Sequence, residues 1–338
     1  MDLALKLAHQ GMHGVGANPM VGCVIEKAGR IIAQGYHQVF GEAHAEINAL
    51  NQINHQADGA TLHVTLEPCS HQGKTPPCAQ AIIESGAKKV IIAMLDPNPL
   101  VSGKGVAMLK NAGIEVLIGL LEEQAQQLNR GFIKRMKTEL PFVTCKIAMS
   151  LDGKTSMHSG ESKWITGESA RVDVQKLRAK NQAILTGSGT ILADNPSMTV
   201  RLQGLNHTPI RAVIDSRDCI TDKTLNIFSN DAPTQIFNTA NTKLAANGKI
   251  KLEDVLLQLG NQGINTILLE AGPGLIGAMI ENNLIDEFII YSAPILMGSH
   301  ANSMAQLPIN KMTDKINLAI HDVRMIDKDM RITASIKS

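Results

Sequence analysis

The chain has 338 residues, of which 44% are hydrophobic and 19% are charged, and its 32 Lys and Arg nearly balance its 31 Asp and Glu. This length predicts two domains, and the near-neutral charge and 3% aromatic content argue against a basic groove with stacking platforms for nucleic acid. We find no signal peptide and no apolar run long enough to span a membrane, so we expect a cytoplasmic protein without a membrane partner.

The five cysteines are odd in number and unevenly spaced, which argues against a disulfide framework. Cys23, Cys145 and Cys219 lie in or beside apolar stretches, and we expect them to be buried as small hydrophobic residues. Cys69 and Cys78 differ from these three because each directly follows a proline.

Strands and helices are predicted to alternate through the first 140 residues. Such alternation favours a mixed or parallel sheet with helices on both faces. Strands are expected at Val21–Ile25, Ile31–Tyr36, Thr61–Leu66, Val90–Leu95 and Ile114–Ile118, and helices at Leu3–Met12 with Asp2 as its cap, Ala45–Leu50, Ala79–Ser85, Lys104–Ala112 and Glu122–Lys137.

A domain boundary is predicted at Leu140-Pro141, after which a second α/β domain is expected. Residues 240–250 are the least patterned part of it and are predicted to be a surface connection. The strands are expected at Phe142–Met149, Ala183–Thr186, Ile210–Asp215, Gln235–Asn238, Thr266–Glu270 and Phe288–Tyr291, and the helices at Ser169–Ala179, Leu252–Leu259 and Leu275–Asn282.

One group of residues in the first half has the composition of a metal site. His44 and Glu46 stand in the sequence His-Ala-Glu, and Cys69 and Cys78 follow downstream. One imidazole and two thiolates fill three corners of a tetrahedral Zn²⁺ and leave the fourth for water, as in catalytic sites. An ion held there lowers the pKa of its water to about 7, and Glu46 is the expected proton carrier. A structural zinc site is disfavoured because no fourth Cys or well-placed His completes it.

The sequence around the two cysteines resembles that of a known family. Eight residues separate Cys69 from Cys78, in place of the two that are usual in zinc nucleobase deaminases. The sequence Leu66-Glu-Pro-Cys-Ser-His-Gln-Gly-Lys-Thr-Pro-Pro-Cys78 resembles the deaminase half of the RibD-like family of bifunctional riboflavin-biosynthesis deaminase/reductases, where this insertion is the rule. The resemblance implies a cytidine-deaminase-like, three-layer α/β/α domain over residues 1–140.

A glycine-rich stretch in the second half, Gly272-Pro-Gly-Leu-Ile-Gly277, spells G-x-G-x-x-G between a predicted strand and helix. We do not predict a Rossmann site there, because the acidic residue expected about twenty positions later is missing. Backbone N–H groups at the start of a helix still favour a phosphate. The run Thr186-Gly-Ser-Gly-Thr190 offers a second loop of this kind.

Four further motifs resemble the reductase half of the same family: Lys146–Lys154, Gly160–Thr166, Gly187–Pro196 and Glu270–Gly274. Two unrelated motif sets therefore occur in the expected order over roughly residues 1–335. The resemblance implies a dihydrofolate-reductase-like α/β domain over residues 141–338, with NADPH as its cofactor.

The family resemblance also implies a role for individual residues. It makes His44, Cys69 and Cys78 the ligands of one zinc ion per chain, and Glu46 the proton donor. A pyrimidine ribotide is expected to contact Asn18, His37, Lys74 and Asn98. The residue before Asn18 is Ala17, where the family usually has a proline. NADP contacts are implied for Ala148, Trp164, Thr190, Asp194, Ser216, Gly272, Pro273, Gly274, Leu275, Ile276, Gly277 and Ala278, and substrate contacts for Ser162, Arg178, the backbone at Met198, Arg201 and Glu270.

The implied function is hydrolytic deamination of 2,5-diamino-6-(5-phosphoribosylamino)pyrimidin-4(3H)-one to 5-amino-6-(5-phosphoribosylamino)uracil, followed by NADPH-dependent reduction of the ribosyl to a ribityl chain. Arg178 and Arg201 are suited to holding the substrate phosphate. A homodimer or higher homo-oligomer is also implied.

Two other functions fit part of this sequence pattern. A zinc nucleoside or tRNA deaminase with an accessory nucleotide-binding domain shares the zinc motif, but the neutral charge, the long cysteine spacing and the second motif set count against it. A nucleotide sensor with a decayed site is disfavoured because every expected catalytic residue is present. Among single residues, core packing stays an alternative for Trp164, and a turn role stays one for Asp194.

Overall fold

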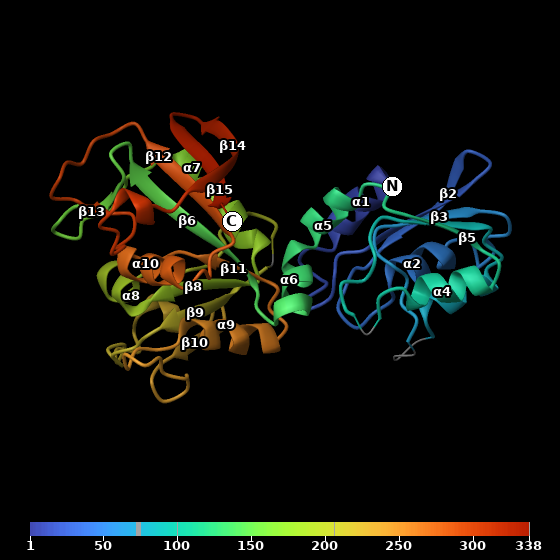
Figure 1. Ribbon diagram of the computed structural model, residues 1–338, viewed down its shortest axis with the longest axis horizontal. Coiled ribbons are helices and arrows are strands. Elements are labelled where there is room, and N and C mark those ends of the chain that lie inside the picture. Colours follow the sequence, from blue (N-terminus) through green and yellow to red (C-terminus); the bar gives the residue numbers. More distant parts are fainter. Residues whose placement is uncertain (72–75, 100, 206, 338) are drawn as a thin grey trace. The chain divides into compact units, whose positions relative to one another are not determined.

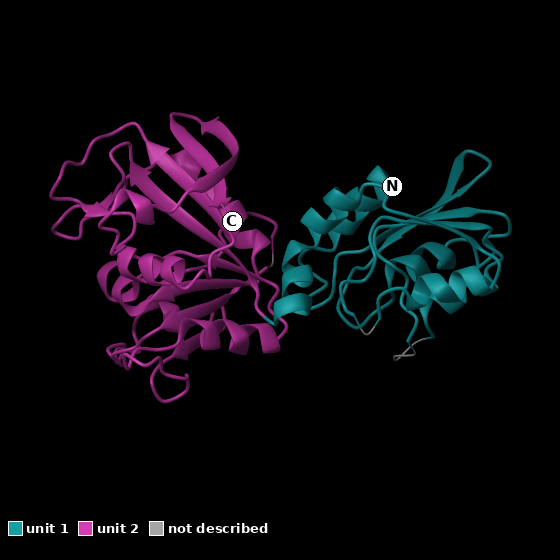
Figure 2. Ribbon diagram, in the orientation of Figure 1, with its two compact units in different colours: residues 1–139 teal, residues 140–338 magenta. Residues whose placement is uncertain are grey.

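The structure is a computed structural model that describes residues 1–71, 76–99, 101–205 and 207–337. The chain divides into two compact units, Met1–Glu139 and Leu140–Ser338 (Figure 2). Within the described residues, no helix combines the length and the apolar character that crossing a membrane requires. All five cysteines are free.

The first unit is built on a five-stranded mixed sheet. Its strands are β1 (Gly22–Lys27), β2 (Arg30–Tyr36), β3 (Thr61–Val64), β4 (Lys89–Ile92) and β5 (Glu115–Ile118), and its helices are α1 (Asp2–Gln10), α2 (Ala45–Asn51), α3 (Cys78–Glu84), α4 (Lys104–Asn111), α5 (Glu122–Leu128) and α6 (Arg130–Thr138). The strand order is β2-β1-β3-β4-β5 (Figure 1). Strand β1 is antiparallel to β2 and β3, whereas β3, β4 and β5 are parallel.

Helices cover both faces of this sheet. Ile25 packs into the core that contains α2, whereas its neighbour Val24 packs against Ala4 of α1. Adjacent strand residues face opposite sides, so α1 and α2 lie on opposite faces. The predicted three-layer α/β/α arrangement is confirmed. Gly35 brings α2 directly onto β2, because a Cβ at this position would lie only 2.6 Å from the backbone nitrogen of Ala49.

The second unit contains an eight-stranded sheet of order β10-β9-β8-β11-β6-β12-β15-β14 (Figure 1). The six strands from β10 to β12 are parallel, and β15 and β14 complete the sheet as an antiparallel hairpin. The elements are β6 (Phe142–Ser150), β7 (Lys154–Ser156), α7 (Glu168–Lys180), β8 (Ala183–Gly187), α8 (Ser188–Asp194), β9 (Ile210–Ile214), β10 (Thr234–Phe237), α9 (Leu252–Asn261), β11 (Thr266–Leu269), α10 (Pro273–Glu281), β12 (Glu287–Ala293), β13 (Asn302–Ser303), β14 (Leu318–Ile326) and β15 (Asp329–Ile336).

The second sheet also has a hydrophobic core on each face. On β11, Leu269 packs with Leu256 of α9 and Met279 of α10, whereas the adjacent Leu268 packs with Leu177 of α7. Strand β11 lies among the parallel strands and is buried on both faces, which explains the apolar run of its last three residues. The predicted second α/β domain is therefore present.

The prediction of one long helix over Glu122–Lys137 is wrong. Helix α5 ends at Leu128 and α6 begins at Arg130, because Asn129 between them leaves the helical conformation at φ −104° and ψ 18°. The buried Asn129 side chain accepts a hydrogen bond from the Met20 nitrogen at 2.8 Å and donates one to the Met20 carbonyl at 2.9 Å. These bonds to a distant segment interrupt a pattern that is otherwise helical.

Two smaller expectations also differ from the structure, and one hairpin was not predicted. Asp2 is the first residue of α1 rather than its cap, and its carboxylate pairs with Lys6 at 2.7 Å. Cys219 is only partly buried, whereas Cys23 and Cys145 are buried as expected. The hairpin β14–β15 was not predicted, because its largely exposed first strand lacks a regular apolar pattern.

We predict that Asn129→Ala destabilises the first unit by about 1–3 kcal/mol, because the Met20 backbone loses both partners. The free energy of unfolding is measured from hydrogen exchange of the most protected amides within residues 1–139. Gln127→Ala, at an exposed position of α5, is the control and is expected to change it by less than about 0.5 kcal/mol. Equal effects of the two substitutions would contradict the role assigned to Asn129.

Candidate active sites

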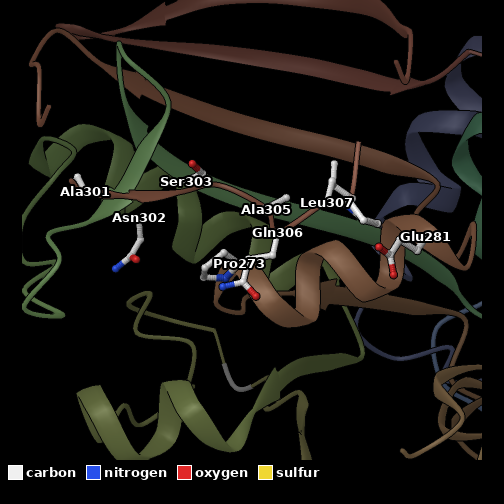
Figure 3. A pocket seen from close by; sticks show the side chains of 9 residues that line it. Pro273, Glu281, Ala301, Asn302, Ser303, Ala305, Gln306 and Leu307 are labelled. Carbon is white, nitrogen blue, oxygen red and sulfur yellow. The ribbon is translucent and has the colours of Figure 1, made fainter. Parts of the chain in front are cut away.

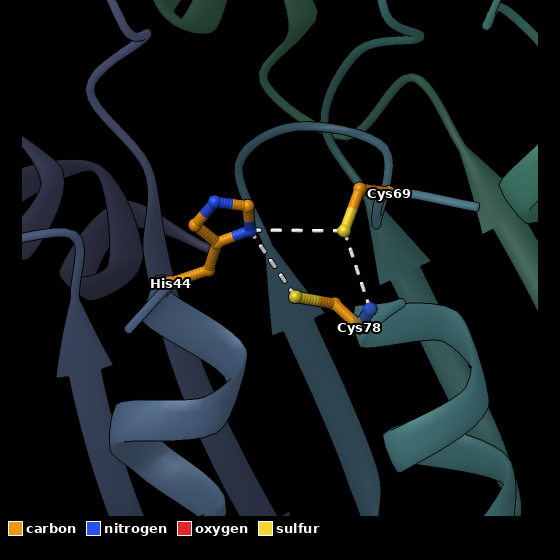
Figure 4. Close-up of side chains that lie close together, drawn as sticks. All are labelled: His44, Cys69 and Cys78. Carbon is orange, nitrogen blue, oxygen red and sulfur yellow. Dashed lines mark hydrogen bonds between the residues drawn. The ribbon is translucent and has the colours of Figure 1, made fainter. Parts of the chain in front are cut away.

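Three predicted metal ligands meet in the first unit. The Nδ1 atom of His44 lies 3.3 Å from the Sγ atom of Cys78 and 3.7 Å from that of Cys69, as Figure 4 shows. All three ligand atoms lie within 4.8 Å of one another. A nitrogen and two sulfurs at this separation form a donor set that fits Zn²⁺, with one coordination position left for water.

Secondary structure brings these ligands together. His44 directly precedes α2, Cys78 is the first residue of α3, and Cys69 lies in the loop after β3. The backbone N–H of Cys78 donates a hydrogen bond to the Cys69 sulfur at 3.2 Å. A hydrogen bond from the Cys78 thiol is the main cause that lowers the pKa of Cys69 to about 4, while the same contact and burial raise the pKa of Cys78. The thiolate form of Cys69 is thus favoured without a metal, and a bound cation would also favour the thiolate form of Cys78.

Glu46 lies in the first turn of α2 and is buried, with 3% of its surface exposed. Burial raises the pKa of this carboxyl to about 7, and the neighbouring Cys69 contributes in the same direction. A cation at the three ligands would oppose this shift. A buried carboxyl two residues after His44, in the first turn of α2, suits a group that both accepts and donates protons. The expected placement of His44 and Glu46 at the start of a helix is confirmed.

Two of the predicted substrate contacts adjoin the metal ligands. Asn18 donates to the His37 ring at 3.1 Å, and the other ring nitrogen of His37 donates to the Ala43 carbonyl at 3.2 Å. Because a carbonyl only accepts, the Asn18 partner is the unprotonated nitrogen of a neutral imidazole, and burial lowers the pKa of His37 accordingly. The His37 and His44 rings meet edge to face with centroids 5.3 Å apart.

The loop that carries Asn18 is held from α6. Arg135 donates to the Ala17 carbonyl at 2.7 Å, and Asn129 binds Met20 on the other side of Asn18. These bonds offset the absence of a proline at position 17. Of the remaining predicted contacts, Asn98 lies in the loop after β4, and Lys74 lies outside the described residues.

In the second unit, most of the predicted site residues gather at one edge of the sheet. Parallel strands place their carboxyl ends together, and ligands of open α/β sheets bind at that edge. Ala148 lies near the end of β6, Ser216 follows β9, and Glu270 follows β11. Thr190 and Asp194 belong to α8, which begins directly after β8, so the Thr186–Thr190 run is a helix start rather than a loop.

Glu270 forms a buried charge cluster with two cations. Its carboxylate accepts from the Arg178 guanidinium at 2.6 and 3.1 Å, and the Lys146 ammonium lies 3.2 Å away. Burial alone would raise the pKa of Glu270, but Arg178 and Lys146 overcome it and lower the pKa to about 2. Arg178 is therefore occupied in holding Glu270. Arg201, whose side chain is exposed, is the better placed of the two arginines to hold a phosphate.

Helix α7 also fixes the segment that contains Met198 and Arg201. Arg178 donates to the Thr199 carbonyl at 3.1 Å, and the Gln175 side chain accepts from the Arg201 nitrogen at 2.9 Å. The Met198 side chain is buried in the core at 2% exposure, and its backbone has a φ of 50°. A substrate contact through the Met198 backbone stays a prediction of the sequence.

A loop before α7 carries Ser162 and Trp164. The Ser162 hydroxyl lies 3.5 Å from the Asp194 carboxylate, which joins this loop to the end of α8. Trp164 is 70% exposed and stacks under the Arg171 guanidinium at 4.6 Å, so the core-packing alternative is excluded. A ring exposed in this way suits contact with a planar ligand.

The glycine-rich stretch forms the start of α10. Gly272 precedes the helix, Pro273 opens it, and no side chain caps its first turn, which leaves backbone N–H groups suited to an anionic cofactor. Gly277 serves packing, because a Cβ there would lie 2.0 Å from the Gln306 carbonyl oxygen. The segment 301–308 lies against this helix and lines an open pocket of about 610 Å³, in which Pro273 and Gln306 adjoin (Figure 3).

Sequence reasoning gave no role to Lys146, although it lies in one of the family motifs. Its partner Glu270 belongs to a different motif, and only the pairing of β6 with β11 brings the two side chains together. A lysine within an apolar strand was the one available signal of a buried charge partner.

Comparisons with known proteins agree with both halves of this geometry. A family model for the RibD C-terminal domain matches residues 141–332, and one for the cytidine and deoxycytidylate deaminase zinc-binding region matches residues 1–94. The riboflavin biosynthesis protein RibD of Escherichia coli K12 is 44% identical over 354 residues, which cover 98% of this chain and 96% of the relative.

Solved structures are similar over the whole chain. Acinetobacter baumannii RibD superposes with a TM-score of 0.91 at 41% identity and covers 100% of this chain and 98% of its own. A diaminohydroxyphosphoribosylaminopyrimidine deaminase/5-amino-6-(5-phosphoribosylamino)uracil reductase from Thermotoga maritima gives a TM-score of 0.90 at 35% identity, with 100% and 97% of the two chains covered.

We predict that Glu270→Gln lowers the free energy of unfolding at pH 7 by about 3 kcal/mol, because the buried Arg178 and the partly buried Lys146 lose their counter-charge. The Glu270 pKa is depressed from 4.5 to about 2, so its contribution is fully present above pH 4.5 and is lost as the pH falls towards 2. The difference between wild type and variant should therefore shrink over that range. Urea unfolding at several pH values measures it.

Glu253→Gln provides the control, since Glu253 forms an ion pair with Lys251 in which both side chains are nearly half exposed. It is expected to have little effect at any pH. A destabilisation by Glu270→Gln that stays constant from pH 7 to pH 3 would contradict the charge assignment.

Proposed function

The chain belongs to the RibD family of riboflavin-biosynthesis proteins, and from this premise we propose how its residues carry out two reactions. It is a bifunctional zinc-dependent deaminase and NADP-dependent reductase. We assign hydrolytic deamination of the diaminopyrimidinone ribotide to residues 1–140 and reduction of the ribosyl chain to residues 141–338. The observation that carries the assignment is the convergence of His44, Cys69 and Cys78 beside Glu46, in a chain whose second half matches the RibD C-terminal domain.

In the deaminase unit, His44, Cys69 and Cys78 would hold zinc, which lowers the pKa of a bound water towards 7. Glu46 accepts one proton as water adds to the ring carbon that bears the exocyclic amine, and it passes this proton to the ring nitrogen. It then accepts the proton of the new hydroxyl group and passes it to the amine, which leaves as ammonia as the carbonyl forms. His37 is neutral and fixed by Ala43, so it orients the Asn18 amide towards the pyrimidine. Asn98 and Lys74 are assigned to the ribose phosphate and base.

In the reductase unit, the cofactor when bound supplies a hydride for C1′ of the opened ribose. Residues 272–275 at the uncapped start of α10 are proposed to hold its phosphates, while Ile276 and Gly277 serve packing. Trp164, Thr190, Asp194, Ser216, Ala148 and Ala278 complete the cofactor contacts. On the substrate side, Arg201 holds the phosphate, and Ser162, the Met198 backbone and the Arg178–Glu270 pair bind the remainder.

We predict that Glu46→Gln lowers the deamination rate by about 10²- to 10⁴-fold, because the amide cannot carry a proton. Mass spectrometry on the ribotide follows the exchange of amine for oxygen without NADPH, and a further gain of two hydrogens with it. The variant should keep one zinc per chain and should still reduce deaminated substrate. Glu84→Gln, on the exposed side of α3, is the control and is expected to behave as wild type.

Retained deamination in Glu46→Gln would remove Glu46 from this role. Deamination without reduction in the wild type would overturn the assignment of residues 141–338. If the zinc-loaded wild type leaves the ribotide unchanged, the proposed substrate is wrong.

We also propose that the chain self-associates through β14. This strand forms one edge of the eight-stranded sheet and exposes Ile320, Val323 and Met325 at 53–63% of their surfaces. An exposed apolar edge strand is a template for pairing, and a second copy brings an identical edge for an antiparallel, two-fold contact.

A cytoplasmic location stays a prediction of the sequence.

We predict that Ile320→Lys shifts the sedimentation velocity of the purified protein from an oligomer to a monomer, because charges on paired edges repel. The matched control is Ile31→Lys, which makes the same change at 56% exposure on the edge strand β2 of the other unit. If both variants sediment as the wild type does, β14 is not the interface.

A further inference from the structure

A buried glutamate next to the metal ligands has no part in the chemistry described so far. Glu67 lies two residues before Cys69, and only 4% of its surface is exposed. Its carboxylate accepts three backbone hydrogen bonds. One oxygen accepts from the nitrogens of Asp96 at 3.2 Å and Gly103 at 3.0 Å, and the other accepts from the nitrogen of Val106 at 3.2 Å.

These donors belong to the loop after β4 and to the first turn of α4. Gly103 precedes α4, and no side chain from its own segment caps the helix. Glu67 therefore caps α4 from a distant part of the chain, and its negative charge faces the positive end of the helix.

The backbone beside Glu67 also touches α4. A Cβ at Gly105 would lie 2.1 Å from the carbonyl oxygen of Pro68, so only glycine permits this approach. Segment 67–68 is thus pressed against the start of α4, and the next residue in the chain is the metal ligand Cys69. Two independent features therefore join segment 67–68 to the start of α4. They are the hydrogen bonds of the Glu67 carboxylate and the close contact of Gly105 with Pro68.

The same loop carries a proposed substrate contact. Asp96, whose nitrogen is bound by Glu67, accepts a hydrogen bond from the nitrogen of Asn98 at 2.8 Å. The position of Asn98 relative to Cys69 is therefore set through Glu67 and Asp96. Misplacing a substrate-binding group by about 1 Å can cost a factor of 10² in rate.

We propose that Glu67 is a positioning residue of the deaminase site, which holds the Asn98 loop in register with the metal ligands. The inference rests on the proposed function of the first unit. Glu67 is not a proton carrier, because three N–H donors occupy its carboxylate, and it is not part of the ligand set. Its own backbone is held independently, since the Glu67 nitrogen donates to the Met94 carbonyl at 3.0 Å. Removing the carboxylate should therefore release the loop and leave Cys69 in place.

The test is Glu67→Gln in the full-length, zinc-loaded enzyme, with the diaminopyrimidinone ribotide as substrate. An amide offers one acceptor oxygen in place of two and turns its NH₂ group towards a backbone N–H. We expect the KM for deamination to rise at least 10-fold, with kcat changed less, zinc still at one per chain, and reduction of deaminated substrate unchanged. Glu115→Gln, which removes a partly exposed ion pair with Lys89, is the control and should leave KM as in the wild type.

Each outcome decides the point. A KM less than 10-fold above that of the wild type overturns the proposal. So does loss of zinc, or a fall in kcat at unchanged KM, which would indicate a purely structural or metal-holding role. A wild type without deaminase activity refutes the proposed function rather than this inference. If Glu67→Gln does not fold, hydrogen exchange of the wild type decides, because strong protection of the Asp96, Gly103 and Val106 amides is required.

Discussion

The deaminase unit depends on one geometric constraint, which is that an imidazole nitrogen and two sulfurs meet within 4.8 Å. Each ligand comes from a different segment, and two of them lie at helix starts. The first backbone N–H groups of a helix have no acceptor within the helix. The N–H of Cys78 is one of these groups, and it stabilises the Cys69 thiolate by donating a hydrogen bond to its sulfur at 3.2 Å. The sheet beneath supplies the rigidity, and Gly35 permits α2 to lie on it closely enough to present His44.

Three buried glutamates have different roles in this protein because their neighbours differ. Glu46 is desolvated without a dedicated cation, which raises its pKa to about 7 and suits it to exchange protons. Glu270 is buried to a similar degree, but Arg178 and Lys146 lower its pKa to about 2, so it remains charged. Glu67 instead faces three backbone N–H groups and acts through position alone. The residue type is constant, and the partners decide between chemistry, charge and architecture.

The sequence predicted what depends on residue type and short spacing. His44, Cys69 and Cys78 could be singled out from the sequence because metal chemistry restricts ligands to a few residue types, and Glu46 because it stands two residues after His44. Most strands were located because burial on both faces requires apolar runs. The break at Asn129, the Lys146–Glu270 pair and the cap from Glu67 were not predicted, since each depends on contacts between segments far apart in the chain. The exposed strand β14 was missed for a related reason, because its neighbours rather than its own pattern hold it in the sheet.

The long insertion between the two cysteine ligands has a consequence for how the site is supported. With only two residues between them, both sulfurs would lie on one short segment whose geometry is set locally. Here Cys78 is placed by α3 and Cys69 by the segment after β3, so their relative position depends on the wider fold. The contact of segment 67–68 with α4 serves a different purpose, because it ties the segment that carries Cys69 to the loop that carries Asn98. Glu67 thus binds backbone rather than metal or substrate, and it sets where the Asn98 loop lies relative to ligands that the fold already holds.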